Sequence, residues 1–155
     1  MHTLRKLLNE SLEGSRLGIT NNFIQHGDTT CLLHTIAVAY YSCRLASIMH
    51  VNLSKKELIR GALLHDYFLY DWHVGKGHKI HGFTHPKAAL INAQEDFNLT
   101  KRERDIIVKH MFPLTPIPPK YKESIIVCLV DKGCSLYETF KRKNSYTKLR
   151  QSIEV

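Results

Sequence analysis

Long apolar runs are missing from this chain. No stretch reaches the ~18 consecutive apolar residues that a membrane-spanning helix needs. The first residues, MHTLRKLLNESLEGS, carry charges where a signal peptide would have its apolar segment. We therefore expect a cytoplasmic protein that does not enter the membrane.

Cysteine and proline are also scarce. The four cysteines lie in apolar segments without a CxxC spacing, at Cys31, Cys43, Cys128 and Cys134. This pattern argues against a disulfide framework or a thiolate zinc site, so we expect buried free thiols. Four of the five prolines stand together in MFPLTPIPPK, which predicts a stiff, extended connector.

The remaining composition is that of an ordinary globular protein. With 155 residues, 43% of them hydrophobic and 23% charged, the chain is suited to one domain and not to disordered or collagenous structure. We expect a single domain over residues 1–155, with its core at about 26–140 and a solvated basic tail at about 141–155.

Positive charge is in excess. The chain has 22 lysines and arginines against 14 acidic residues, a net charge of +8. This surplus favours anionic partners, whether small phosphorylated molecules, nucleic acid or an acidic membrane surface. The basic tail has no aromatic ladder beside it to stack bases, so we do not favour nucleic acid.

Helix signals recur along the chain. An N-cap at Asp28-Thr29-Thr30 precedes CLLHTIAVAYYSCRLASIMH, and a Ser54–Glu57 capping box opens a helix that should end near Asp66. Thr84-His85-Pro86 predicts the start of another helix. Thr100–Glu103 is a second capping box, and YKESIIVCLVDKGCSLYETF predicts a last helix. No segment alternates with period two, so the sequence predicts an all-α, compact, bundle-like domain.

Several ionisable residues interrupt the apolar stripes of these helices. They are His34, the pair His65-Asp66, His110 and Asp131, with His85 at a helix start. Burying such groups costs several kcal/mol, roughly, unless they are paired, hydrogen-bonded or bound to metal. Each has a simple structural explanation on its own, but their number favours one shared site.

Imidazole and carboxylate ligands suit iron, manganese, zinc or cobalt. Adjacent helical residues point about 100° apart, so His65 and Asp66 reach one centre only from a helix end or with Asp66 bridging. A bridging aspartate implies two ions, which together can stabilise the attacking and leaving oxygens of phosphoryl transfer.

The order and context of these residues resemble a known signature. His34, His65-Asp66 in GALLHDYF and Asp131 in CLVDKG are similar to the H…HD…D pattern of HD-domain metal-dependent phosphohydrolases. With His85 and His110 the pattern is H…HD…H…H…D, which resembles the superfamily members with dinuclear centres. The resemblance implies one ion on His34, His65, Asp66 and Asp131, and a second on Asp66, His85 and His110.

The chain also departs from particular members of that superfamily. It lacks the GYP motif of the cyclic-dinucleotide phosphodiesterases, and it is shorter than the (p)ppGpp and dNTP hydrolases. We therefore expect a small hydrolase that acts on a phosphate ester, with a nucleotide as the favoured substrate, through a metal-bound hydroxide. Two alternatives stay open: a di-iron oxygenase, and a non-catalytic nucleotide-binding regulatory protein.

The segment YFLYDWHVGKGHKIHGFT supplies candidate catalytic and binding residues. Asp71 or His81 could protonate a leaving alkoxide, and Lys76 and Lys79 could bind phosphate. His81 lies four residues before His85 and could replace it as a ligand if that helix began early. Lys132, next to Asp131, is a further candidate for phosphate binding.

Overall fold

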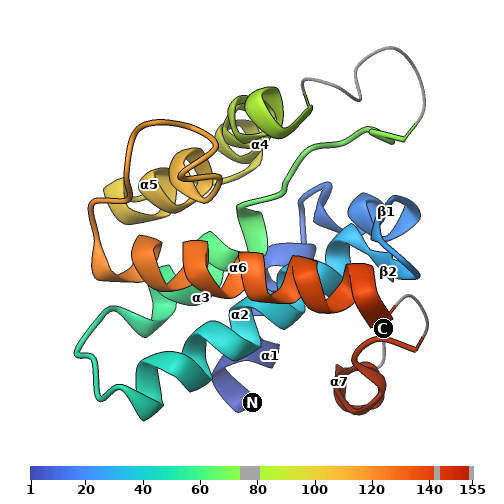
Figure 1. The fold of residues 1–155 in the computed structure, drawn as a ribbon, viewed down its shortest axis with the longest axis horizontal. Helices are drawn as coiled ribbons and strands as arrows, with labels where there is room; N and C mark the ends of the chain where they lie inside the picture. The colour runs from blue at the N-terminus through green and yellow to red at the C-terminus, as the bar shows by residue number, and fades with distance from the viewer. Residues whose placement is uncertain (74–80, 142–143, 154–155) are drawn as a thin grey trace.

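The described part of the protein is a bundle of helices with one short hairpin (Figure 1). The computed structural model describes residues 1–73, 81–141 and 144–153. The helical elements are α1 (His2–Leu12), the 3-10 helix η1 (Leu17–Asn22), α2 (Cys31–Ile48), α3 (Lys55–Leu64), α4 (His81–Asp96), α5 (Lys101–Lys109), α6 (Lys122–Lys141) and α7 (Thr147–Ile153). The all-α, single-domain prediction is confirmed.

A two-residue turn joins β1 (Ile24–His26) to β2 (Thr29–Thr30). The strands are antiparallel, with Ile24 opposite Thr30 and His26 opposite Thr29, and the register is irregular between these pairs. The expectation of almost no sheet therefore holds across the described residues. The hairpin leads directly into α2, and it brings Gln25 and His26 close to the start of that helix.

Helix α2 is the centre of the core and packs against both α3 and α6. Thr30 caps it by accepting a hydrogen bond from the Leu33 amide at 3.2 Å, as the sequence predicts. Its length and apolar composition meet the criteria for a membrane span, but 61% of it is buried inside the fold. Burial of that kind is also what the central helix of a globular domain shows.

Helices α3 and α5 approach closely at Gly61. A Cβ atom at this position would lie 2.2 Å from Ile106 Cδ1, so only glycine permits the observed spacing. The contact matters for the site because α3 ends at His65 and α5 ends at His110. It fixes the distance between two helix ends that carry candidate ligands.

The two predicted capping boxes differ in outcome. At Thr100 the box is complete, because the Glu103 amide donates to the Thr100 side chain and the Thr100 amide donates to Glu103. Ser54 accepts from the Glu57 amide, but its own amide donates to Glu123 of α6 at 2.8 Å. Glu123 thus takes the place predicted for Glu57, which instead pairs with Arg102.

Two terminal segments depart from the sequence-based description. Helix α1 was not predicted, although Leu4, Leu7 and Leu8 follow a helical period and are buried. The tail is not simply solvated: Tyr146 and Leu149 are buried in the core cluster.

Helix α4 begins earlier than the sequence predicts. It starts at His81, which places Pro86 inside the helix.

Candidate metal centre

Five helical elements bring the six predicted ligands together. His34 lies in the first turn of α2, His65 and Asp66 directly follow α3, His110 follows α5, and His85 and Asp131 lie within α4 and α6. Their exposed fractions run from 0% to 6%, so the whole group is shielded from bulk water. All six candidates therefore share one buried region, as the sequence predicts.

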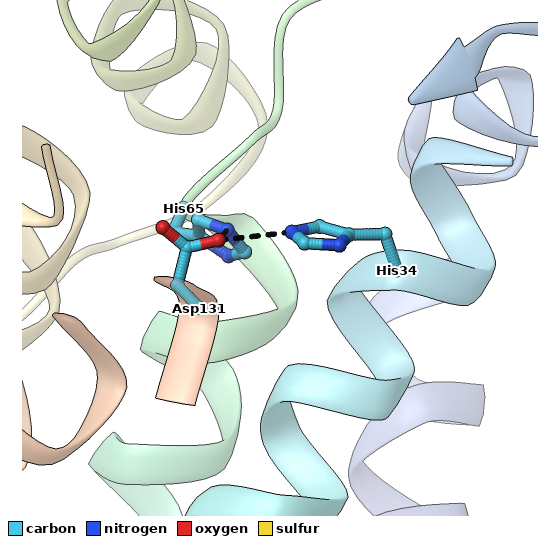
Figure 2. A group of neighbouring side chains, drawn as sticks. All are labelled: His34, His65 and Asp131. Carbon is cyan, nitrogen blue, oxygen red and sulfur yellow. Dashed lines mark hydrogen bonds and ion pairs between the residues drawn. The ribbon is translucent and has the colours of Figure 1, made fainter. Parts of the chain in front are cut away.

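One group is centred on Asp131 (Figure 2). Its Oδ1 atom lies 3.1 Å from His34 Nε2 and 3.5 Å from His65 Nε2. One ligand atom from each of these three residues falls within 4.8 Å of the others. This spacing could hold a metal ion.

A second group lies on the other side of Asp66. His65, Asp66 and His110 also have ligand atoms within 4.8 Å of one another. His85 joins them, with its Nε2 atom 3.1 Å from Asp66 Oδ1 and 2.7 Å from His110 Nε2. The structure thus places His85 beside the ligand set that the resemblance implies for it.

The two oxygens of Asp66 face different partners. Oδ1 faces His85 and His110, at 3.1 and 3.4 Å, while Oδ2 faces His34 and His65, at 3.7 and 3.5 Å. Asp66 follows α3 and is not held in its regular helical ladder, which frees the side chain to lie between the groups. This is the arrangement that a bridging carboxylate requires.

Hydrogen bonds orient three of the imidazole rings. The Nδ1 atoms of His65 and His110 donate to the carbonyls of Ala62 and Ile107, at 2.7 and 2.8 Å. His34 Nδ1 donates to the Glu138 carboxylate at 2.9 Å. Each ring therefore directs Nε2 into the cluster, the orientation in which a neutral histidine binds metal.

Two buried polar atoms fit the same interpretation. His65 Nε2 and Asp66 Oδ1 lie at ion-pair distance from their neighbours but make no hydrogen bond among the described residues. A buried acceptor without a donor costs about 1 to 3 kcal/mol. A cation in the cluster would satisfy both atoms at once, so the donor set suits a divalent ion.

Electrostatics keep the carboxylates ionised. Burial raises the pKa of Asp131 and Asp66, but neighbouring histidines outweigh burial and hold both pKa values below the usual range. Burial also lowers the pKa of His34, and Glu138 and Asp131 reverse that effect and raise it well above its ordinary value. For His110 burial prevails, and its pKa is lowered.

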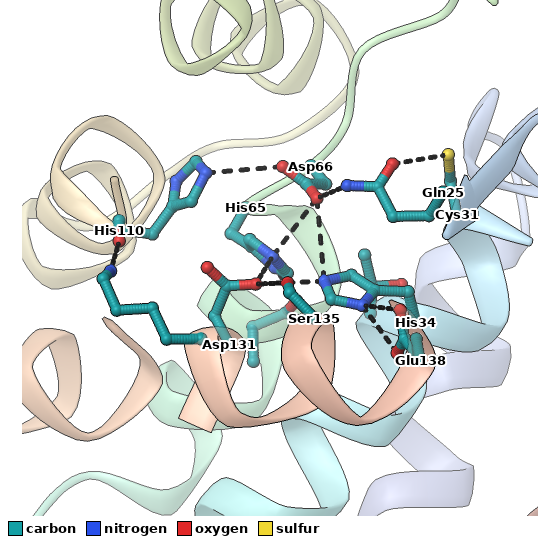
Figure 3. Close-up of polar contacts among 12 residues, drawn as sticks. Gln25, Cys31, His34, His65, Asp66, His110, Asp131, Ser135 and Glu138 are labelled. Carbon is teal, nitrogen blue, oxygen red and sulfur yellow. Dashed lines mark hydrogen bonds and ion pairs between the residues drawn. The ribbon is translucent and has the colours of Figure 1, made fainter. Parts of the chain in front are cut away.

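Sequence reasoning missed two residues that hold the ligands in place (Figure 3). Gln25 donates to Asp66 Oδ2 at 2.7 Å, and it accepts from the Cys31 thiol. Glu138 accepts from His34 and from the Tyr146 hydroxyl, the latter at 2.9 Å. Glu138 follows Asp131 by seven residues, two helical turns, and that spacing could have identified it.

A cavity of about 830 Å³ opens beside the cluster. Asp66, His85, His110 and Asp131 lie in its lining, and Trp72, Met111, Leu114 and Leu136 contribute apolar surface. A volume of this size is typical of small-molecule sites. Four of the candidate ligands are therefore accessible to a small molecule from the side of this cavity.

The predicted loop residues have mixed outcomes. Asp71 is exposed, accepts from the His73 amide at 2.9 Å and is not part of the cavity lining. Lys132 lines the cavity, but its ammonium donates to the His110 carbonyl at 2.8 Å and to the Cys128 carbonyl at 3.3 Å. Lys76 and Lys79 lie outside the described residues, as does the side chain of His81.

The four cysteines are free. Three are buried as predicted, while Cys43 is only partly buried. Burial raises the pKa of the Cys31 thiol, which opposes its use as a thiolate ligand. Nitrogen and oxygen donors alone thus make up the candidate metal centre.

Comparisons of the chain with family models, curated proteins and solved structures found no match.

Proposed function

We propose that the protein is a metal-dependent phosphohydrolase of the HD-domain type that acts on a small phosphate ester. One observation carries the proposal: Asp66 lies between two groups of buried ligands, and four of these ligands line a cavity. We infer that His34, His65, Asp66 and Asp131 hold one divalent ion. Asp66, His85 and His110 would hold a second.

Bound divalent ions would supply a Lewis acid and lower the pKa of water for attack on phosphorus. The protein's own contribution is to hold the ligands in one orientation and protonation state. Glu138 fixes the His34 ring through Nδ1, and Gln25 fixes Asp66 through Oδ2. These contacts reduce the reorganisation that substrate binding would otherwise require.

The lining of the cavity supports a nucleotide or similar substrate. Trp72 and the His26 ring lie 6.2 Å apart between centroids, and both line the cavity. Aromatic rings provide a surface on which a base can stack. The +8 net charge favours the approach of an anionic phosphate.

The test combines metal analysis with a substrate panel. Protein purified without oxygen is analysed for metal, then assayed with mono-, di- and cyclic phosphates in Mn²⁺, Co²⁺ and Fe²⁺. We expect slow turnover of p-nitrophenyl phosphate and faster turnover of a nucleotide or sugar phosphate. Asp131→Asn should abolish turnover of both kinds of substrate. His2→Ala, on the exposed face of α1, should leave turnover unchanged.

A different result would redirect the interpretation. If the metal sites are occupied and none of the phosphate substrates is hydrolysed, the hydrolase proposal is wrong. An oxygen-reactive, mixed-valence iron pair in such a protein would then point to an oxygenase. A full site without either reactivity would point to a regulatory protein.

A further inference from the structure

A second cavity, of about 570 Å³, lies on the opposite side of α6 from the first. Residues of α2 and α6 form most of its lining, and Tyr146, just before α7, closes one side. Figure 1 shows α6 running past α2, with α7 near its C-terminal end. The two cavities share no lining residue, so this one is separate from the proposed substrate site.

Three tyrosine rings give the second cavity its aromatic character. The Tyr146 ring lies 6.0 Å from that of Tyr41 and 5.2 Å from that of Tyr137, between centroids. Tyr146 is buried, whereas Tyr41 and Tyr137 are 40% and 44% exposed. Parts of two rings are thus open to a planar ligand, which could stack on them.

The charge of this cavity is positive. Arg44 is exposed in its lining, and its guanidinium lies 6.0 Å from the centroid of the Tyr40 ring. No ion pair joins Arg44 to an acidic residue in the described part of the chain. Among the described residues, no Asp or Glu lines the cavity. An anionic group on the ligand would therefore meet an unneutralised cation.

Gly133 keeps the cavity open from the side of α6. It lies inside a 20-residue helix, where glycine costs about 1 kcal/mol relative to alanine. A Cβ atom built here would meet no heavy atom within 4 Å, in contrast to Gly61. Close packing therefore does not explain this glycine, and the space beside it belongs to the cavity lining.

A chain of hydrogen bonds runs from this cavity to the metal-ligand cluster. The Tyr146 hydroxyl donates to Glu138, and Glu138 accepts from His34 Nδ1 at 2.9 Å. The other nitrogen of His34 faces Asp131 Oδ1 at 3.1 Å. Tyr146 also has a backbone φ of 58°, which is rare for an aromatic residue, so its position is imposed by its surroundings.

We propose that this cavity is a second ligand site, which takes a planar aromatic anion and communicates with the metal-ligand cluster through Tyr146, Glu138 and His34. The aromatic rings and Arg44 would recognise the ring and the anionic group of the ligand. A ligand that packs against Tyr146 would then alter how firmly Glu138 holds His34. The communication rests on the proposed metal site, whereas ligand binding does not.

Binding is tested with 2-naphthalenesulfonate as the probe and uncharged 2-naphthalenemethanol for comparison, by calorimetry on the full chain. We expect the sulfonate to bind more tightly than the alcohol. Arg44→Gln should weaken its binding by about tenfold or more. Gly133→Leu should block it by filling the cavity, and Arg104→Gln, an exposed arginine on α5, serves as the control. If the sulfonate binds all variants equally, or does not bind the wild type, the proposal of a second ligand site is wrong.

Communication is tested through the dissociation constant of Mn²⁺, measured with and without saturating probe. We expect a change of about fivefold or more, with a reciprocal effect of Mn²⁺ on the probe. Tyr146→Phe keeps the aromatic ring but removes the hydroxyl, so it should bind the probe and lose the change. An Mn²⁺ constant that the probe leaves unaltered would refute the connection. A wild type that binds no Mn²⁺ at all would refute the proposed function, while probe binding still decides the site.

Discussion

The Nε2 atoms of His85 and His110 lie 2.7 Å apart, and both face Asp66 Oδ1. His110 already donates from Nδ1 to the Ile107 carbonyl, so its Nε2 atom is an acceptor when the ring is neutral. Two imidazole nitrogens at this distance share a proton or a cation. A cation that bound both rings through Nε2 would have to take the place of any proton between them.

Metal content should therefore depend differently on Asp66 and His110. Asp66→Ala removes the carboxylate common to both groups, so we expect loss of both ions. His110→Ala should lose one. Elemental analysis of the purified variants measures this, with His2→Ala as a control. Full metal retention in Asp66→Ala would contradict the two-ion arrangement.

Chelation should lower the melting temperature. Without a cation, His65 Nε2 and Asp66 Oδ1 remain buried and make no hydrogen bond among the described residues. A ligand present at 100 times its dissociation constant stabilises the native state by about 2.7 kcal/mol. Melting curves recorded with a chelator, and again after Mn²⁺ or Fe²⁺ is restored, should show a loss and a recovery. No shift in protein that demonstrably carries metal beforehand would show that the metal does not stabilise the fold.

Glu138→Gln should weaken metal binding without removing a ligand. The amide keeps the shape of the side chain but loses the charge that holds His34 Nδ1–H. Partners of this kind typically change metal affinity by roughly 10- to 100-fold. A competition titration with a chromogenic chelator gives the constant. The matched variant Glu95→Gln, at an exposed surface pair, should leave that constant unaltered.

Gly61→Ala should destabilise the fold. Its Cβ would lie 2.2 Å from Ile106 Cδ1 and 3.1 Å from Ile106 Cβ, which forces α3 and α5 apart. Overpacking of this kind costs about 1 to 3 kcal/mol. Urea titration measures the free energy of unfolding. Gly133→Ala is the matched control, because its Cβ meets nothing within 4 Å and helix propensity favours alanine.

Asp96 should contribute a pH-dependent part of the stability. Hydrogen bonds from Arg16, and then from the Tyr67 hydroxyl, lower the pKa of Asp96 below its ordinary 3.8. A lowered pKa in the folded state gives stability above about pH 4, which is lost as the pH falls through the folded-state pKa. The melting temperature of Asp96→Asn should therefore lie below that of the wild type at pH 7. The two should converge in acid; a constant difference at all pH values would contradict this account.

The elements that local signals define were predictable from the sequence. Thr100 and Glu103 form reciprocal hydrogen bonds within four residues, so the start of α5 could be predicted from the local sequence. Ser54 shows the limit of such reasoning, because its amide bonds to Glu123, 69 residues away. The proline in Thr84-His85-Pro86 suggested a helix start, yet α4 begins at His81 and continues through it.

The ligand cluster was predictable because its members break apolar helical patterns. Gln25 was not, since it lies on a short strand whose position depends on the hairpin. The position of Lys132 next to Asp131 predicts phosphate binding, but the sequence does not show that its ammonium donates to the His110 and Cys128 carbonyls. The local sequence shows which side chains are unusual for their helix, whereas tertiary contacts determine their hydrogen-bond partners.

The separation of the ligands along the chain has a consequence for folding. His34 contacts Asp131 across 97 residues and Glu138 across 104. Contacts between such distant segments form late, because loop closure must precede them. During synthesis, α1 to α3 are therefore made well before their histidines can meet α6. Until α6 follows, His34 and His65 lack their contacts with Asp131 and Glu138, so the candidate metal centre is incomplete in the nascent chain.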